Sequence, residues 1–246
     1  MDSLETELER ARALDESELA DAIETIGFEC TRCGACCKAE SACGEGDDSA
    51  DETDGVAGES EGDGAAETDA EPHTATVFPD EIRQLQGAGE YDFRDVARPM
   101  PYGVADGPDG PEGETFEWAL QTDDCGDCTF YAEDGDGTGA CTVHGDRPLI
   151  CRTYPFSVAL GGTSQPMGEA VDEEGMVRAH ECEGLGRDIS RTEAEELAAA
   201  LKERAVRELE EAIGVRDNYR PVDPPAGQVV VHDSEGAKRP DGSAYE

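Results

Sequence analysis

Cysteines are the residues of this chain whose type and spacing could do chemistry. The chain has 10 cysteines among 246 residues. The run CTRCGACC places four of them, Cys30, Cys33, Cys36 and Cys37, within eight positions. Thiolates at two-residue intervals can converge on one point, so they suit a tetrahedral metal ion or an iron–sulfur cluster. The sequence therefore predicts a metal- or cluster-binding protein.

The first run can be interpreted in two ways. Cys30, Cys33 and Cys36 have the spacing by which three thiolates hold a cubane cluster, whereas Cys30 and Cys33 alone would make a zinc knuckle. Gly34 can take the positive φ that a knuckle turn needs. Cys36 and Cys37 are adjacent, and in an extended backbone their side chains would diverge. We therefore expect Cys37 to point away from its neighbour's site, toward a second metal or a shared binuclear site.

A second set of cysteines lies far downstream: Cys125, Cys128, Cys141, Cys151 and Cys182. Residues 129–131 and 140–143 flank the turn-rich DGDGTG and predict a hairpin, which would bring Cys128 near Cys141. Cys125 and Cys128 are themselves spaced like a zinc knuckle. The sequence leaves open which of these two binds metal.

The tracts CTRCGACC, CTFY, ACTVHGDRPLICRTYPF and CEG occur in order within residues 30–37 and 125–184. Together they resemble the YkgJ-type cysteine-cluster family, also described as a zinc- or iron-chelating CxxCxxCC domain. Cys43 and Cys125 fall outside the family pattern. The resemblance implies enough ligands for two four-thiolate sites: Cys30, Cys33, Cys36, Cys37, Cys128, Cys141, Cys151 and Cys182.

Arginines can offset the negative charge that a site of four thiolates retains around its metal. Arg32, Arg147 and Arg152 are placed for this role in a chain that has few cations. Arg147 and Arg152 also match the family's most recognisable tract, so we predict that these two contact the cofactor. The alternative is that the arginines only pack or pair with carboxylates.

Four histidines complete the candidates. His180 lies two residues before Cys182 and is an alternative metal ligand. His144 is expected to have a hydrogen-bonding role, and His73 and His232 are expected at the surface.

The expected cofactor is iron or an iron–sulfur cluster, or alternatively zinc. The corresponding functions are a redox or metal-handling module and a purely structural zinc protein. Relatives in the resembled family are often labelled iron–sulfur oxidoreductases, and some are associated with protein lysine methylation, so a cluster-dependent oxidoreductase or a methylation component is a further alternative. The chain lacks G-x-S-x-G, P-loop and G-x-G-x-x-G motifs, which removes support for hydrolase, kinase and dinucleotide-binding functions.

The charge of the chain is strongly acidic, with 19 basic and 60 acidic residues and a formal charge of −41. Because the acidity is spread along the whole chain, we interpret it as adaptation to high salt rather than a surface for basic partners. Nucleic-acid binding is not expected, since the basic patch that it requires is missing.

The expected location is the cytoplasm. No apolar run approaches the roughly 20 residues that cross a bilayer, and MDSLETELER lacks the features of a secretory signal. In a reducing compartment, clustered cysteines are expected to be metal ligands rather than disulfides.

The fold class expected is α+β, with terminal helices around a small irregular β core stapled by metal. Apolar spacing predicts helices in 1–27, in 79–85 behind Pro79, and from Ser190 onward with a capping box to Glu193. Strands are predicted at 116–120 and 229–231, and 98–113 is predicted to be loop. One metal-binding domain is expected, divided into 1–43, a disordered acidic insertion at 44–72, 73–189, a helix at 190–216 and a tail at 217–246.

Overall fold

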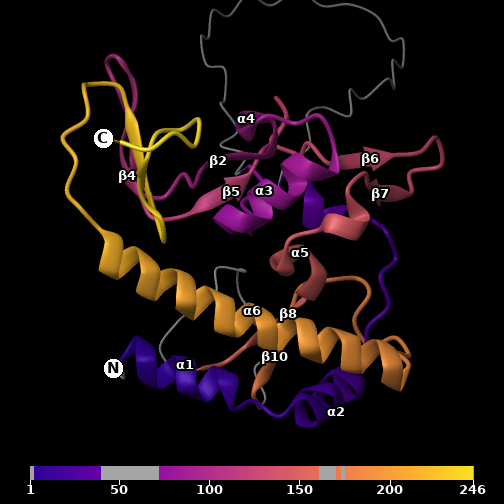
Figure 1. Cartoon of the computed structure of the whole chain (residues 1–246). Coiled ribbons are helices and arrows are strands. Elements are labelled where there is room, and N and C mark those ends of the chain that lie inside the picture. Colours follow the sequence, from indigo (N-terminus) through magenta and orange to yellow (C-terminus); the bar gives the residue numbers. More distant parts are fainter. Residues whose placement is uncertain (1–2, 40–71, 161–169, 173–174, 246) are drawn as a thin grey trace, which may run out of the picture.

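The computed structural model describes residues 3–39, 72–160, 170–172 and 175–245. Cys43 and nearly all of the acidic segment 44–72, which was predicted to be disordered, lie outside the described residues. The described part is a mixed α+β fold with several small sheets, as expected (Figure 1). Within it, no helix is both long and apolar enough to cross a membrane.

Two helices form the N-terminus, as the apolar spacing predicted. They are α1 (Leu4–Arg12) and α2 (Glu16–Ile26). The Ser3 side chain accepts a hydrogen bond from the Thr6 amide, and Asp15 accepts from the first amides of α2, so both helices have N-caps. Gly27, at φ 78°, ends α2 in a conformation that glycine adopts without strain.

The long helix α6 (Arg191–Asn218) lies along α1 and α2 (Figure 1). Ser190 and Glu193 form the predicted capping box, each side chain accepting the other's backbone amide. A stripe of small and aliphatic side chains on α6 is buried, including Ala198, Leu201 and Leu209. This stripe explains the packing, because small residues let neighbouring helices approach closely.

A three-stranded antiparallel sheet completes this part of the molecule, in the order β8 (Phe156–Val158), β10 (Val177–His180), β9 (Ala170–Asp172). None of these strands was predicted. Phe156, Val158 and Val177 of this sheet pack with α1, α2 and α6 in one apolar cluster, which we call the first cluster.

A second apolar cluster is built on another antiparallel sheet, ordered β1 (Thr76–Val77), β5 (Trp118–Leu120), β2 (Ala97–Pro99). The helices α3 (Pro79–Ala88) and α4 (Phe93–Val96) lie beside it. Pro79 begins α3 as predicted. The strand at 116–120 is shorter than predicted, and all three of its residues are buried because β5 is the central strand, whereas Phe116 lies outside it and is exposed.

The loop predicted at 98–113 is wrong. This segment contains β3 (Val104–Gly107) and the start of β4 (Gly110–Thr115), in a four-stranded sheet with β11 (Val229–Asp233) and β12 (Gly236–Lys238). Its glycines permit close backbone approach instead of breaking the strands: a Cβ on Gly113 would lie 2.2 Å from the Gly103 carbonyl oxygen. The parallel pairing of β4 with β11 is a long-range contact that local composition does not reveal.

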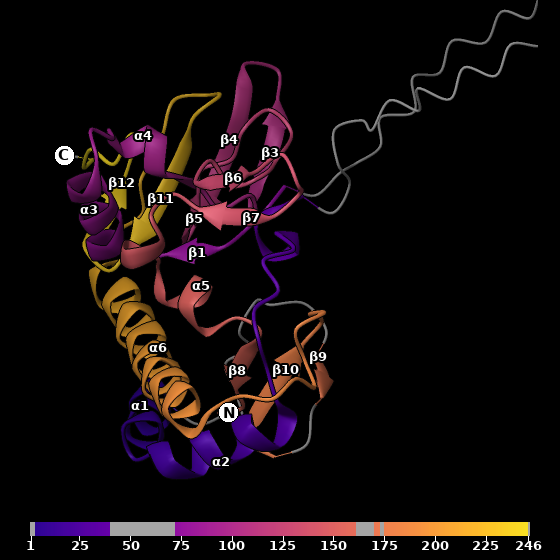
Figure 2. The ribbon, with the colours of Figure 1, turned by 90° about the vertical axis from the view of Figure 1, so that its right-hand side faces the viewer.

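Short elements connect the two clusters. The predicted hairpin is formed by β6 (Tyr131–Glu133) and β7 (Gly139–Cys141), two residues later in its first arm than expected. Cys36 and Cys37 lie in the single turn η1 (Ala35–Cys37), and Cys151 lies in the short helix α5 (Leu149–Thr153). A second single turn, η2 (His144–Asp146), comes shortly after Cys141. In Figures 1 and 2, α5 lies between the sheets near α3 and the helical layer of α1, α2 and α6.

Candidate metal centre

The first cysteine run is held by backbone hydrogen bonds to three distant tracts. The Glu29 amide donates to the Gly184 carbonyl over 3.0 Å, the Gly139 amide donates to the Arg32 carbonyl over 2.8 Å, and the Cys128 amide donates to the Cys37 carbonyl over 2.8 Å. Each partner lies in or beside a tract that carries a downstream cysteine. The run therefore passes close to Cys182, then Cys141, then Cys128.

The turn inside this run agrees with the prediction for Gly34, which has φ 78°. A Cβ at this position would come within 2.3 Å of the Tyr131 hydroxyl, so Tyr131 fills the space that the glycine leaves. The expectation that Cys36 and Cys37 diverge is wrong, because the backbone is a 3-10 turn and not extended. Their sulfurs lie 3.9 Å apart. Both thiols therefore lie at one place, where they could bind one metal ion or two ions in adjoining sites.

Four cysteines gather at the second apolar cluster. Cys128 is part of that cluster with 6% of its surface exposed, and the other three pack against it. We call these four the inner group: Cys37, Cys128, Cys141 and Cys151.

Three further cysteines form an outer group: Cys30, Cys33 and Cys182. Charge on Cys30 or Cys33 raises the pKa of Cys182, which places these three within electrostatic reach of one another. Cys36 connects the two groups, because its charge raises the pKa of Cys182 and also those of Cys128, Cys141 and Cys151. These electrostatic interactions divide the eight thiols into two sets, and Cys36 interacts with both.

Backbone amides are directed at several of these sulfurs. The Gly184 amide donates to Cys182 Sγ over 3.4 Å. Amides of Phe130 and Tyr131 lower the pKa of Cys128, and the amide of Val143 lowers the pKa of Cys141, which places these amides near the two sulfurs. In each case a donor lies two residues after the cysteine. Such hydrogen bonds stabilise the thiolate form, and they are the supporting contacts that metal-bound cysteines use.

Removal from water disfavours the thiolate form of the same cysteines and so raises their pKa values. It is the main cause that raises the pKa of Cys128 to about 11, and it also raises the pKa values of Cys141, Cys151 and Cys182. Hydrogen bonding to Cys37 is the main cause that raises the pKa of Cys36. At neutral pH these groups are therefore protonated unless a cation compensates the thiolate charge.

Among the described ranges, no three His, Cys, Asp or Glu side chains have an arrangement that would hold a metal ion. Eight thiols nevertheless lie in one region, and all eight are free. The donor set fits a thiophilic metal such as zinc or iron, since it consists of sulfur and includes amide donors to that sulfur.

Of the three arginines, Arg147 lies close to the thiols. Its charge lowers the pKa values of Cys36 and Cys141, although the larger causes named above raise them overall, and its Nε donates to the His144 carbonyl over 3.1 Å. Arg32 contributes its carbonyl to the contact with Gly139 and has an unusual φ of 60°. The Arg152 side chain is exposed on α5.

The sequence left open whether Cys125 or Cys128 binds metal, and the two cysteines differ in the structure. Cys125 is disulfide-bonded, and Cys128 is a free, buried thiol. The expectation that cysteines in this chain are ligands rather than disulfide partners therefore fails for Cys125. A half-cystine has no thiolate to offer a metal, so Cys128 is the better ligand of the two.

The histidine expectations are partly wrong. His232 is fully buried, stacked on the ring of Phe116 with centroids 5.5 Å apart, because β11 is an interior strand. His73 is half-buried, and its burial lowers its pKa to about 4. His180 is buried, with Nε2 hydrogen-bonded to Ser157 Oγ at 2.8 Å. His144 is exposed.

Sequence reasoning missed Glu81, which holds α5 in position. One carboxylate oxygen accepts from the Phe78 amide at 3.0 Å and the other from the Leu149 amide at 2.8 Å. Glu81 therefore caps the first turns of α3 and α5 together and orients the helix that carries Cys151. The only local signal was an acidic residue in the first turn of α3, which does not reveal the second contact.

The described residues form an α+β fold with eight free cysteines. Residues 29–183 match the model of the CxxCxxCC family, whose description is "Putative zinc- or iron-chelating domain". The chain belongs to this family. The family description supports metal binding and names zinc and iron as the alternative metals. No curated protein and no solved structure matches the chain.

Proposed function

We propose that the chain is a metal-binding module in which eight thiolates hold metal in two adjoining sites. The inner group, Cys37, Cys128, Cys141 and Cys151, would provide one site. The outer group, Cys30, Cys33 and Cys182, would provide the other, and Cys36 at the junction would complete it. Arg147 would offset part of the negative charge of the loaded centre.

The observation that carries this proposal is the set of amide donors directed at sulfur. Amides aimed at Cys128, Cys141 and Cys182 favour thiolates in places where loss of hydration disfavours them. A protein that needed only inert buried thiols would gain little from these contacts, because a neutral thiol is a weak acceptor. A bound metal cation would compensate the thiolate charge that the amides favour and that the loss of hydration disfavours.

Iron, alone or as an iron–sulfur cluster, is the metal we propose first. The C-x2-C-x2-C spacing of the first run supports it, since this spacing lets three thiolates hold three irons of a cubane. Such a centre would give the module a redox or metal-handling role.

Zinc is the second candidate, and the inner group favours it. Four thiols that contact one apolar cluster would form a closed site without a free coordination position, which is typical of structural zinc. In that case the metal would contribute folding free energy and no chemistry.

Elemental analysis of protein purified without oxygen tests the proposal. We expect two or more metal equivalents per chain. A brown protein with acid-labile sulfide close to its iron content would identify the cluster, and a colourless protein with zinc alone would exclude iron. A chain without bound zinc or iron, which also fails to take up either after anaerobic reconstitution, would contradict the proposal itself.

The adjacent cysteines provide a sharper test of two sites. Because Cys36 faces both groups and Cys37 contacts the inner group, we expect Cys36→Ser to lose more metal than Cys37→Ser. Metal content of the two purified variants, measured beside the unsubstituted chain, gives the comparison. Equal losses would count against a junction at Cys36.

A further inference from the structure

A pocket of about 390 Å³ lies between α6 and the sheet that contains β5, and none of its lining residues is a cysteine. Glu208, Glu211 and Val215 of α6 form one wall, and Trp118, Phe116 and Tyr102 form much of the other. The volume falls in the range of small-ligand pockets, which is about 300–1,000 Å³. Nothing in the proposed metal centre uses this pocket.

Exposed aromatic side chains gather at the walls of this pocket. Tyr102 is 59% exposed and Phe116 is 48% exposed, and they are two of the four most exposed large hydrophobic side chains in the described residues. Both line this pocket. Exposed aromatic rings concentrated at one concave place indicate a binding site more strongly than rings scattered singly over a surface.

Carboxylates also line the pocket, and no Lys, Arg or His side chain is among its described lining residues. Asp233 accepts from the Trp118 indole at 2.9 Å, and Glu208 is paired with Arg204 at 2.7 Å. Among the described residues no Lys or Arg is paired with Glu117 or Glu211, and Glu211 instead accepts a hydrogen bond from the Ser234 amide at 2.8 Å. Removal from water is the main cause that raises the pKa of each; neighbouring carboxylates also raise both, whereas the hydrogen bonds from Ser234 lower the pKa of Glu211 in part. Glu117 keeps exposed surface because it stands in the wall of an open pocket.

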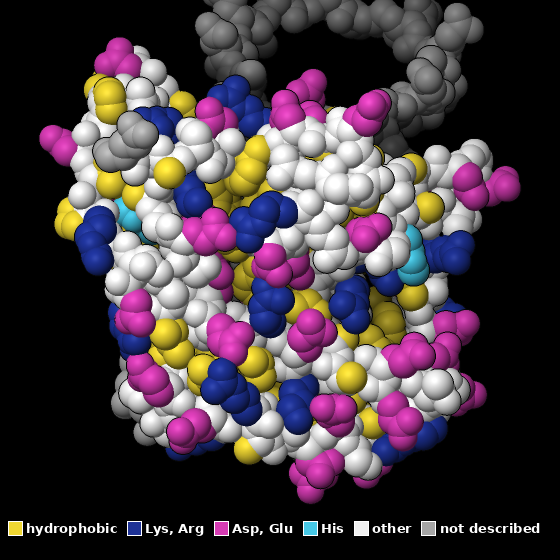
Figure 3. Space-filling model, viewed as in Figure 1, with side chains coloured by type: hydrophobic (Ala, Val, Ile, Leu, Met, Phe, Trp, Pro, Cys, Tyr) yellow, Lys and Arg dark blue, Asp and Glu magenta, His cyan; other side chains and the backbone are white. Residues whose placement is uncertain are grey.

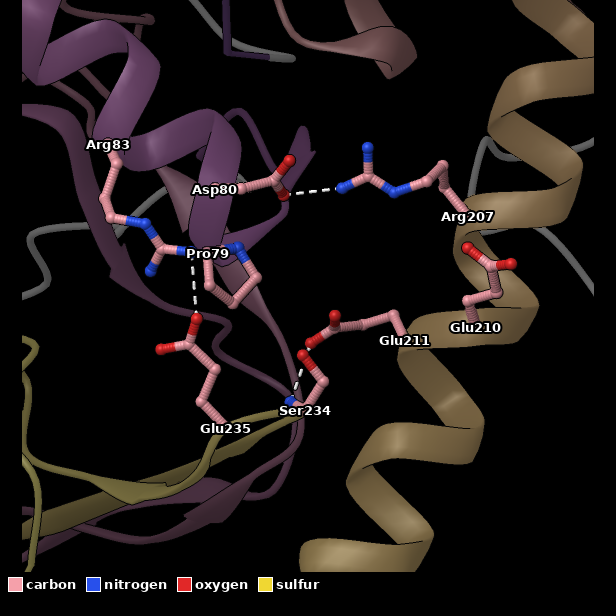
Figure 4. A pocket seen from close by; sticks show the side chains of 8 residues that line it. All are labelled: Pro79, Asp80, Arg83, Arg207, Glu210, Glu211, Ser234 and Glu235. Atoms are coloured by element: carbon pink, nitrogen blue, oxygen red, sulfur yellow. Dashed lines mark hydrogen bonds and ion pairs between the residues drawn. The ribbon is translucent and has the colours of Figure 1, made fainter.

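The adjoining pocket shows the contrast. It shares Glu211 and is drawn in Figure 4, where Arg207 reaches Asp80 at 2.5 Å and Arg83 reaches Glu235 at 2.9 Å. Arginines and carboxylates are likewise interspersed over the face shown in Figure 3. In this adjoining pocket Asp80 and Glu235 have arginine partners, whereas within the described residues Glu117 lines the first pocket without one.

We propose that this pocket binds an organic cation, an ammonium group on a short apolar stem. The stem would lie against Trp118 and Val215, and the ammonium would lie between Glu117 and Glu211 with the faces of Tyr102 or Phe116 beside it. Aromatic faces and carboxylates both attract such a group, and the apolar walls suit its stem. A free amine and a lysine side chain of another polypeptide present the same chemistry.

Calorimetric titration of the full metal-loaded chain with n-hexylammonium tests the proposal. We expect saturable binding, with n-hexanol and n-hexanoate bound at least about tenfold more weakly, because the carboxylates are charge-assisted partners of the ammonium. The double variant Glu117→Gln, Glu211→Gln should weaken n-hexylammonium binding about tenfold. Tyr102→Ala, whose ring is largely exposed and so dispensable for folding, should weaken it about two- to fivefold.

Glu210→Gln is the matched control, since Glu210 lies on the same helix but lines only the adjoining pocket. It should leave the affinity unchanged, and none of the variants should change metal content. A short unstructured peptide with one lysine, titrated in parallel, distinguishes the two sources: binding of either probe supports the site, and the stronger of the two identifies its ligand. Absence of binding by both, or binding of n-hexanol as tight as that of n-hexylammonium, would overturn it.

Discussion

Cys128→Ser is expected to remove the metal of the inner group and most of the stability that this metal provides. Cys128 is the most buried of the eight thiols, lies inside the second apolar cluster, and accepts amide hydrogen bonds from the following turn. A serine hydroxyl does not replace a thiolate as a ligand, because it stays protonated at neutral pH. The three remaining thiolates would hold the metal far more weakly.

The measurement is metal content together with unfolding in denaturant. We expect the loaded variant to carry fewer metal equivalents than the unsubstituted chain and to unfold at a midpoint between those of the unsubstituted chain with and without chelator, because the outer group keeps its metal. The physical reason is linkage: a metal that binds only the folded state adds its binding free energy to stability. Metal-free forms of the two proteins should differ by only about 1 kcal/mol, the cost of a buried hydroxyl that keeps partial hydrogen bonding.

Cys125→Ser is the control for this experiment. Cys125 is disulfide-bonded and provides no thiolate, so its loss can change stability without changing metal content. If both variants kept a full complement of metal, the inner group would not be a metal site. If both lost metal equally, the choice of Cys128 over Cys125 would be wrong.

The sequence predicted local elements well where a local signal exists. Caps and apolar spacing placed α1, α2, α3 and α6, because N-cap side chains and Pro79 act within a few residues of their helix. The two strands in 98–113 were not predicted. One of them, β4, pairs in parallel with β11, which lies more than a hundred residues later, and a local pattern does not reveal such a partner. The burial of His232 was missed for the same reason.

The candidate site divides in a similar way. Spacing and resemblance selected eight cysteines, and these are the free cysteines of the described residues. Their grouping could not be predicted, since it depends on hydrogen bonds such as Glu29 to Gly184 that join distant tracts. The relation of Cys36 to Cys37 was mispredicted because the local backbone is a 3-10 turn, which two adjacent cysteines do not specify.

Arg204 connects the helical layer to the helix that carries Cys151, and Arg204→Met is expected to destabilise the protein by about 3 kcal/mol. Arg204 is 1% exposed, and its guanidinium donates to Glu208 at 2.7 Å and to Thr153 Oγ1 at 3.0 Å. It also reaches the Phe156 carbonyl at the start of β8. Removing it leaves Glu208 without this cation in a half-buried place and takes a donor from Thr153, which is fully buried.

Arg216→Met is the control on the same helix, because it removes an arginine whose side chain is not buried. Arg216 pairs with Glu5 at 2.7 Å, but its side chain is 47% exposed, so we expect a change below about 1 kcal/mol. Free energies of unfolding from denaturant titration of the loaded proteins provide the comparison. Because Thr153 and Phe156 lie two and five residues after Cys151, Arg204→Met should also weaken metal retention against a chelator, whereas Arg216→Met should not. Equal stability and equal metal retention of the two variants would show that Arg204 does not hold α5 against α6. The position of Cys151 would then depend on Glu81 and the second apolar cluster alone.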